Sequence, residues 1–254
     1  MCSIGSSTIV RTKIMDKKQD VMARLAELKS RLIGQRTTRG IVRFPMSADE
    51  AALHLLAAIQ AEVERRGRMF EDSPVLHEHI RKIAGLFTTP TTKFGIMLCG
   101  GVGNGKSTML KALQNLLNYL QIPNNSSSTF STYGMRIESA KFLCHQIRVD
   151  PKNLLHFQQL DMLGIDDLGE EEASVMDYGN RVTPVIDLLS YRYDRILFTM
   201  VTTNLTPAQI RSTYGDRIAD RFNEMMLIIP YQEPSFRTPQ HAERILDDSD
   251  TSDH

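Results

Sequence analysis

The sequence has few cysteines, no long apolar run and no excess of either charge. Its three cysteines, Cys2, Cys99 and Cys144, are odd in number and have no paired spacing. They favour neither a disulfide framework nor a zinc site, and they indicate a reducing compartment. No apolar run approaches the length of a membrane span, and residues 1–10 lack the basic start and apolar middle of a signal peptide. We therefore expect a cytoplasmic protein without a membrane partner.

Charge is balanced overall but unevenly distributed. Lysine plus arginine and aspartate plus glutamate each number 30, so the net charge indicates no particular partner. Residues 1–45 carry ten basic residues and three acidic ones, whereas the last stretch contains Asp247, Asp248, Asp250 and Asp253. A basic start suits contact with an acidic surface such as nucleic acid, and it is equally typical of a solvated helix face.

The most informative stretch is Phe94 to Leu110. A short apolar run, Ile96 to Cys99, is followed by Gly100 to Ser107, which fits Gly-x-x-x-x-Gly-Lys-Ser, and then by residues of helical period. Strand, glycine loop and helix N-terminus together direct backbone N–H groups at a phosphate. Lys106 would reach the β- and γ-phosphates of a nucleotide, and the Ser107 hydroxyl would ligate Mg²⁺. A glycine turn beside a solvated lysine is the alternative, but the flanking strand and helix favour a nucleotide-binding loop.

A second apolar strand, from Leu160, ends in the adjacent carboxylates Asp166 and Asp167. Because the carboxyl ends of parallel strands line the ligand crevice of an open sheet, both acids are expected beside the phosphates. Asp166 would hold Mg²⁺, and Asp167 would orient or deprotonate the attacking water. The alternative is a strand-end turn in which the two aspartates cap the next segment.

Three later features supply further candidates. Asn204 ends the strand Ile196 to Thr203 and would hydrogen-bond the γ-phosphate or the water, unless it only makes an Asx turn before Pro207. Arg217 and Arg221 are four residues apart and so share a helix face, where Asp220 and Glu224 are their candidate surface partners. Arg237 follows the last strand and could reach a phosphate, although alone this is a weak signal.

Alternation of strands and helices predicts an α/β fold, a doubly wound parallel five-stranded sheet with an N-terminal helical extension. The strands are expected at Ile96–Cys99, Met135–Glu138, Leu160–Asp166, Ile196–Thr203 and Met226–Tyr231. Residues 1–45 are expected to form a partner-binding arm, which consists of a disordered start, a basic amphipathic helix from Asp16 to Gly34 and a linker over 35–45. A helical segment follows over 46–92, with helices beginning at the Ser47–Glu50 capping box and at Ser73–Pro74. The core then spans 93–240, and a disordered acidic tail spans 241–254.

From Phe94 to Arg237, the order of these motifs resembles the AAA+ ATPases, in particular the branch of DnaC-type helicase loaders and IstB-type transposition ATPases. Residues 164–169 resemble Walker B, 188–193 the helix before strand four, 202–205 sensor I, 214–222 the arginine-finger helix and 235–237 sensor II. The Walker A residues are Gly100, Gly101, Val102, Gly103, Asn104, Gly105, Lys106, Ser107 and Thr108.

The resemblance implies ATP and Mg²⁺ as ligands. It also implies that Arg221 acts on the ATP of a neighbouring subunit and Arg237 on that of its own, while Arg217 either assists or pairs with Asp216 or Asp220. Many AAA+ proteins carry glutamate in place of Asp167, so slow, switch-like hydrolysis is expected. Because the sequence ends soon after Arg237, a full helical lid domain is not expected.

We therefore predict an ATPase that acts in DNA replication as a helicase loader, with the accessory ATPase of a transposase as the alternative. A small-molecule P-loop kinase would need an arginine-rich lid and an acceptor pocket, and the sensor-like Asn204 also disfavours it. An interaction protein with a vestigial site is disfavoured by the intact Lys106, Ser107 and Asp166. The predicted partners are a replicative helicase or a transposase, DNA (single-stranded in particular), and a second copy of the chain at the Arg221 face.

Overall fold

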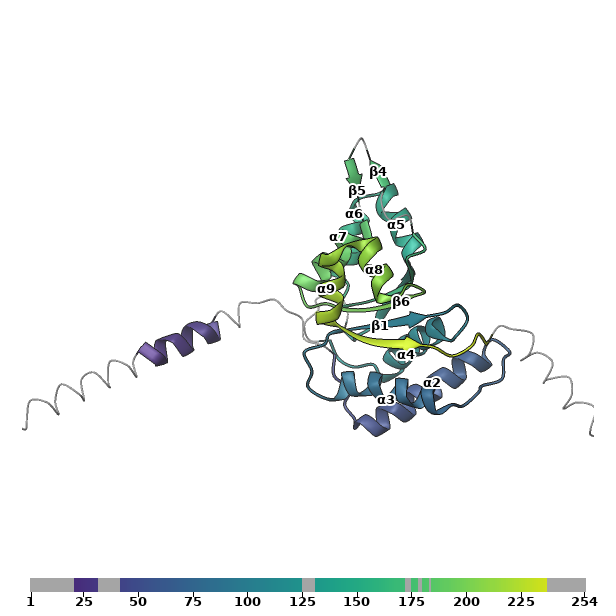
Figure 1. The fold of residues 1–254 in the computed structure, drawn as a ribbon. Coiled ribbons are helices and arrows are strands. Elements are labelled where there is room, and N and C mark those ends of the chain that lie inside the picture. Colours follow the sequence, from purple (N-terminus) through teal and green to yellow (C-terminus); the bar gives the residue numbers. More distant parts are fainter. Residues whose placement is uncertain are drawn as a thin grey trace, which may run out of the picture. The chain divides into compact units, whose positions relative to one another are not determined.

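The computed structural model describes residues 21–31, 42–124, 131–171, 175–177, 180–182 and 184–236, with the backbone alone for 175–177 and 180–182. The chain divides into two units, Met1–Thr38 and Arg39–His254 (Figure 1). In the first unit, residues 21–31 are helical, and their large apolar side chains are between 48% and 61% exposed: Val21, Met22, Leu25 and Leu28. The predicted start and end of this helix at Asp16 and Gly34, and the acidic tail, lie outside the described residues.

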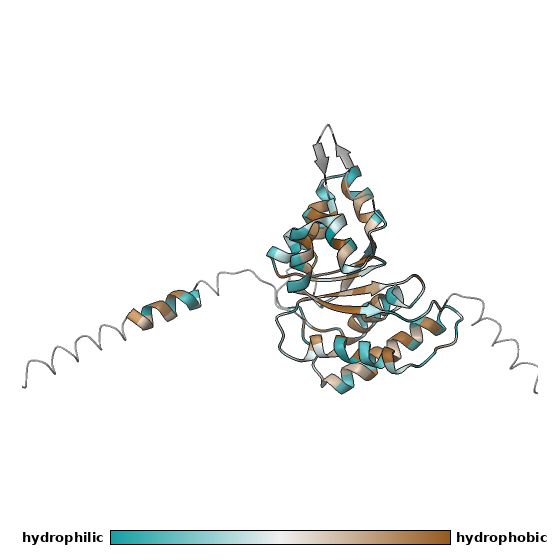
Figure 2. Ribbon diagram, in the orientation of Figure 1, coloured by the Kyte–Doolittle hydropathy of each residue, from teal (hydrophilic) through white to brown (hydrophobic). Residues whose placement is uncertain are grey.

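The second unit contains the predicted five-stranded parallel sheet, with strand order β2-β3-β6-β1-β7. Its strands are β1 (Gly95–Gly100), β2 (Met135–Ser139), β3 (Met162–Leu168), β6 (Phe198–Thr203) and β7 (Met226–Tyr231). Each coincides with a strand expected from the sequence, and apolar residues, brown in Figure 2, recur along the strands that can be seen there. Successive residues of a strand face opposite sides of a sheet. Accordingly, Ile96 and Leu98 of β1 join one hydrophobic cluster, and Met97 joins the other.

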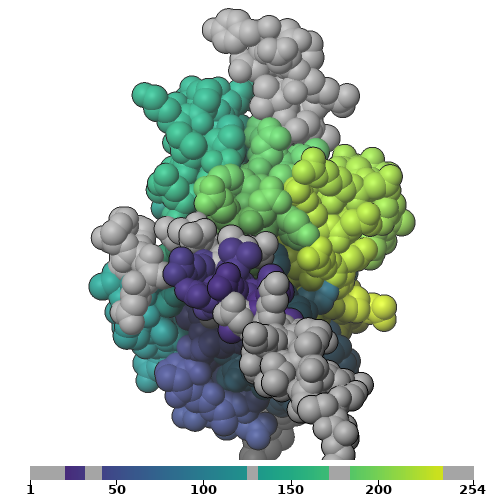
Figure 3. Space-filling model, turned by 90° about the vertical axis from the view of Figure 1, so that its left-hand side faces the viewer, coloured from purple at the N-terminus to yellow at the C-terminus, as the bar shows by residue number. Residues whose placement is uncertain are grey.

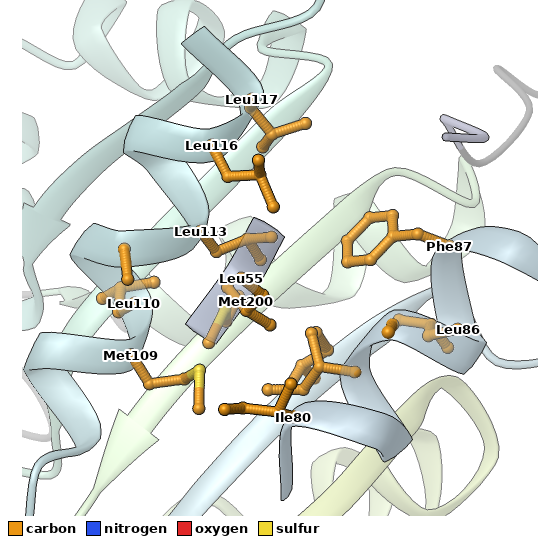
Figure 4. Close-up of a cluster of buried hydrophobic side chains, with 14 of the residues drawn as sticks. Leu55, Ile80, Leu86, Phe87, Met109, Leu110, Leu113, Leu116, Leu117 and Met200 are labelled. Atoms are coloured by element: carbon orange, nitrogen blue, oxygen red, sulfur yellow. The ribbon is translucent and has the colours of Figure 1, made fainter. Parts of the chain in front are cut away.

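One face of the sheet is covered by α2 (Ala48–Glu64), α3 (Pro74–Thr88) and α4 (Lys106–Leu120), whose side chains form the cluster in Figure 4. The hydroxyls of Ser47 and Ser73 cap α2 and α3 by accepting the N–H groups of Glu50 at 3.2 Å and Leu76 at 3.1 Å. Both predicted helix starts are therefore correct.

The predicted linker over 35–45 ends earlier than expected. Val42 and Phe44 are 3% and 6% exposed, and the Phe44 ring stacks on Phe87 with centroids 4.6 Å apart. Arg43 donates to the backbone oxygens of Leu86 and Thr89, both at 2.7 Å. Residues 42–45 therefore belong to the second unit, because two apolar side chains in a basic stretch pack beside α3.

The other face of the sheet carries the remaining helices. These are α5 (Ala140–Val149), α6 (Lys152–Gln159), α7 (Pro184–Asp194), α8 (Pro207–Tyr214) and α9 (Asp216–Met225). Two elements were not predicted: the short helix α6, and a hairpin of β4 (Val175–Asp177) and β5 (Asn180–Val182) between β3 and α7. Cys99 and Cys144 are both buried. Within the described residues, no helix combines the length and apolarity needed to cross a membrane.

Candidate functional site

The glycine loop connects the end of β1 to the start of α4. Gly100 must lack a side chain, because a Cβ there would lie 1.9 Å from the backbone oxygen of Tyr231 in the neighbouring strand β7. Gly105, which precedes α4, has φ +92°, a left-handed conformation that favours glycine. No side chain caps α4, so the first N–H groups of this helix remain available to an anion.

Lys106 lies at the centre of the site and is only 5% exposed. Its Nζ donates to the backbone oxygens of Gly100 at 2.9 Å and Gly101 at 2.5 Å. It also donates to the side-chain oxygens of Asn104 at 3.1 Å and Asn204 at 3.0 Å. Asn204, for which the sequence predicts contact with the γ-phosphate or the attacking water, thus contacts Lys106 directly and joins the end of β6 to the loop. An ammonium has three N–H donors, so a phosphate could bind Lys106 only by replacing one or more of these four oxygens.

Asp166 is held by two hydroxyl groups from different elements. Its Oδ1 accepts Ser107 Oγ at 2.8 Å and Thr202 Oγ1 at 2.6 Å. The sequence placed Ser107 and Asp166 at one metal site, and the structure brings them into contact. Thr202 was overlooked as a positioning residue, although it stands two residues before Asn204 in the same motif.

This donor set fits a magnesium ion. Mg²⁺ prefers oxygen ligands and usually keeps several waters while binding one or two carboxylates and substrate phosphates. Ser107 and Asp166 supply a hydroxyl and a carboxylate beside the lysine that would hold the phosphates. Among the described residues, no group of three histidine, cysteine, aspartate or glutamate side chains is arranged for a metal. A hydroxyl and a single carboxylate would leave the other positions around such an ion to water and phosphate oxygens.

Asp167 differs from Asp166 in conformation and exposure. Its φ is +55° and its side chain is exposed, and the β3–β6 register shifts between Ile165 and Leu168. Its backbone N–H donates to Thr202 Oγ1 at 2.9 Å. Aspartate tolerates the left-handed region better than most residues, and an irregularity of this kind re-aims a side chain at the end of a strand.

Arg221 lies on α9 and packs against α7 of the same chain. Its side chain is 11% exposed, its Nη2 lies 3.1 Å from Asp194 Oδ1, and its guanidinium lies 4.7 Å from the centroid of the Tyr193 ring. Its Nη1 is buried and has no hydrogen-bond partner among the described residues. The arginine is thus held in place with one donor still unused.

Asp220 and Glu224, the candidate surface partners of Arg217 and Arg221, instead contact residues of other helices. Arg211 on α8 forms ion pairs with Asp216 and with Asp220, the latter at 2.8 Å. Glu224 instead accepts the Tyr193 hydroxyl. These acidic residues contact side chains of α8 and α7. Helical spacing within α9 cannot predict such contacts between helices.

The segment after β7 returns to the glycine loop. The backbone N–H of Phe236 donates to the backbone oxygen of Gly103 at 3.1 Å, and Asn104 Nδ2 donates to the backbone oxygen of Tyr231, also at 3.1 Å. The loop is therefore tied to β7 on one side and to β6 on the other. Arg237, the next residue, lies outside the described part of the chain.

The sheet order, the loop between β1 and α4, and the polar strand ends of β3 and β6 define the AAA+ class of P-loop NTPase folds. The predicted fold is therefore confirmed.

Solved structures with this fold include a DnaC helicase loader, with a TM-score of 0.50, 18% identity and coverage of 64% of this chain and 93% of that one. A putative primosome component from Streptococcus pyogenes serotype M3 has a TM-score of 0.50, 16% identity and coverage of 72% and 98%. A DNA replication initiation factor has a TM-score of 0.50 and 14% identity, and the match covers 71% of this chain and 52% of that one.

At these identities the likeness establishes the fold, and it confirms the structural resemblance to DnaC-type AAA+ proteins that the motifs predicted. No model of a known protein family matches the sequence. No curated protein matches it either.

Proposed function

We propose that the chain is a Mg²⁺-dependent ATPase of the AAA+ class that acts in DNA replication as a helicase loader. The observation that carries this proposal is the convergence of Lys106, Asn204, Ser107 and Asp166 at one end of the sheet. The fold shared with a DnaC helicase loader supports the replication assignment. A transposase-associated ATPase of the IstB type is the competing assignment, and the choice of partner distinguishes the two.

Each side chain has a role that follows from its position. Lys106 holds the β- and γ-phosphates while keeping its contact with Asn204, which orients the γ-phosphate or the attacking water. Ser107 and Asp166 hold Mg²⁺, which neutralises charge on the phosphate oxygens when bound. Exposed Asp167 accepts a proton from water. Because its side chain is shorter than glutamate, we expect turnover far below the hundred per second at the upper end for phosphoryl transfer.

The helix over 21–31 is proposed as the partner-binding arm. Val21, Leu25 and Leu28 are each about half exposed and recur at helical spacing, which suits docking into a groove of a partner protein. Because Val42 and Phe44 belong to the core of the second unit, an arm deletion should stop at Thr38.

Deletion of residues 1–38 is expected to leave ATP affinity unchanged and to abolish capture of a replicative helicase in a pull-down with purified proteins. Leu25→Ser with Leu28→Ser in the full chain should reproduce the loss, whereas Lys29→Gln should not if docking is apolar. A truncated chain that captures the helicase at full affinity would disprove the arm assignment. Capture of a transposase and not of a helicase would favour the IstB-type function.

A basic face on α5 and the start of α6 is proposed as a DNA contact. Lys141, His145 and Arg148 are exposed at helical spacing on α5, Lys152 is exposed at the start of α6, and Asp150 is the single acidic residue over 140–159. Phe142 on the same helix is 41% exposed and offers a ring for base stacking. This helix belongs to the teal surface of Figure 3.

The Lys141→Gln, Lys152→Gln double variant is expected to bind a single-stranded oligonucleotide more weakly. The slope of log affinity against log salt should fall by about 1.4, because two phosphate contacts are lost and each contributes about 0.7 on single strands. Lys82→Gln on α3, where Lys82 pairs with Glu78 at 2.6 Å, is the control. Fluorescence anisotropy in a salt series measures the slope, and an unchanged slope would place the DNA contact elsewhere.

A further inference from the structure

The turn over 167–171, which follows the carboxylates of β3, is unusually constrained. Gly169 has φ +107°, and a Cβ there would lie 2.7 Å from Leu205 Cδ1, directly after Asn204. The N–H of Glu170 donates to the backbone oxygen of Asp167 at 3.1 Å. Thr203 Oγ1 donates to the backbone oxygen of Leu168 at 2.6 Å. The backbone that carries Asp167 is thus pressed against the segment that carries Asn204.

Glu171 closes this turn with a buried carboxylate. It is 9% exposed; its Oε2 accepts the N–H of Gly169 at 2.8 Å, and its Oε1 accepts the hydroxyl of Tyr214. A buried carboxylate is costly unless its oxygens are hydrogen-bonded, so both donors matter to the turn. Burial, together with the hydrogen bond to Glu171, raises the pKa of Tyr214, so the phenol remains a proton donor throughout the physiological pH range.

Tyr214 connects this turn to the helix that carries the candidate finger arginine. It is the last residue of α8 and only 6% exposed, and Gly215 separates it from α9, which bears Arg217 and Arg221. A shift of the turn would therefore reach α9 through one buried hydrogen bond and one residue of chain. The pair spans 43 residues of sequence, so neither partner is a local turn contact.

We propose that Glu171 and Tyr214 are positioning residues that fix the Asp167 turn and couple it to the α8–α9 junction. The proposal rests on the ATPase function above, because its effect on rate is felt through Asp167. The pair itself touches neither phosphate nor metal. It sets where the Asp167 carboxylate stands, and a displacement of about 1 Å at a reacting group can cost about a hundredfold in rate.

The test compares Tyr214→Phe, Glu171→Ala and their double variant by calorimetry and steady-state hydrolysis. We expect each single variant to lower kcat about tenfold or more with ATP affinity unchanged, and the double variant to be no worse than the poorer single one. Tyr119→Phe, an exposed tyrosine on α4, should behave as the parent. Unchanged kcat in both single variants, or independent and multiplicative losses, would overturn the proposal.

Glu171→Gln separates positioning from direct catalysis. A glutamine can accept the Gly169 N–H with its oxygen and donate its amide to the Tyr214 oxygen, so both contacts remain without the charge, although the direction of the second bond is reversed. Activity within about threefold of the parent is expected from the conserved bonds. A loss as large as that of Glu171→Ala would overturn the positioning role, because it would mean that the charge of Glu171 acts directly.

Hydrogen exchange tests the pair independently of hydrolysis. Tyr214→Phe is expected to speed exchange of the backbone amides over 167–171 and over α9, with the strands of the sheet unchanged. Unchanged exchange in both segments would overturn the coupling, even if the parent chain proved inactive. A parent chain that neither binds nor hydrolyses ATP would instead refute the proposed function, so the two failures are distinguishable.

Discussion

The Lys106→Ala variant is expected to bind Mg·ATP at least about a hundredfold more weakly than the parent chain, a loss of about 2.7 kcal/mol. Lys106 Nζ sits among four oxygens from the loop and from Asn204, so it is fixed before the ligand arrives. Its bonds to phosphate oxygens are charge-assisted and stronger than neutral hydrogen bonds. Calorimetry with a non-hydrolysable ATP analogue measures the loss.

Two controls separate this effect from loss of folding. Lys106→Met keeps most of the aliphatic stem that packs at the start of α4 and should lose affinity to the same extent as alanine. Lys111→Ala, on the same helix and only partly exposed, should keep the parent affinity. Thermal melting shows whether each variant is folded. Equal affinity of folded Lys106→Ala and parent would refute the nucleotide site.

The Arg221→Ala variant is expected to bind ATP normally and to hydrolyse it about a thousandfold more slowly, the lower end of the range for arginine fingers. In the subunit described here, Arg221 is held by Asp194 and lies over the Tyr193 ring. A role at a neighbouring site therefore requires that it leave Asp194 when subunits assemble. Its Nη1 has no hydrogen-bond partner among the described residues, but this atom is buried, so it too can reach a neighbouring phosphate only if the side chain moves.

Mixing Arg221→Ala with Lys106→Ala subunits tests action between subunits. One interface in the mixture combines an intact nucleotide site with an intact arginine, so part of the activity should return. The absence of rescue, with both variants shown to co-assemble, would mean that Arg221 serves its own subunit.

Asp194→Asn distinguishes a finger from a structural ion pair. If Arg221 only stabilises the packing of α9 on α7 through its ion pair with Asp194, removing the charge of Asp194 should slow hydrolysis as much as removing Arg221. If Arg221 acts across an interface, Asp194→Asn should keep most of the activity. Arg217→Ala, on the same helix but exposed, is expected to have the smaller effect.

The sheet and the loop could be predicted because their signals are local. Strands β1, β3, β6 and β7 contain apolar runs, and Gly100 and Gly105 stand where a close approach to β7 and a left-handed backbone require glycine. Asp166 lies near the carboxyl end of β3 and Asn204 follows the neighbouring strand β6, so strand order brings both to the loop.

Contacts between residues that lie far apart in the sequence could not be predicted. Arg192 is fully buried. Its Nε donates to Thr199 Oγ1, and its Nη1 donates to the backbone oxygens of Phe157 and Leu160. In the sequence it is simply one arginine of a helix, and arginine is almost never fully buried unless its donors are paired. Val42 and Phe44, in a stretch predicted as a linker, are the same kind of case, because only the space beside α3 explains their burial.

The central claim is that the loop over 100–108, with Asp166 and Asn204, binds Mg·ATP. Titration of the full chain with a non-hydrolysable ATP analogue, in Mg²⁺ and again in excess chelator, tests this claim most directly. The account predicts saturable binding of one nucleotide per chain, weakened at least about tenfold without Mg²⁺ because Ser107 and Asp166 then hold no ion. No saturable binding in Mg²⁺ at millimolar analogue would contradict it.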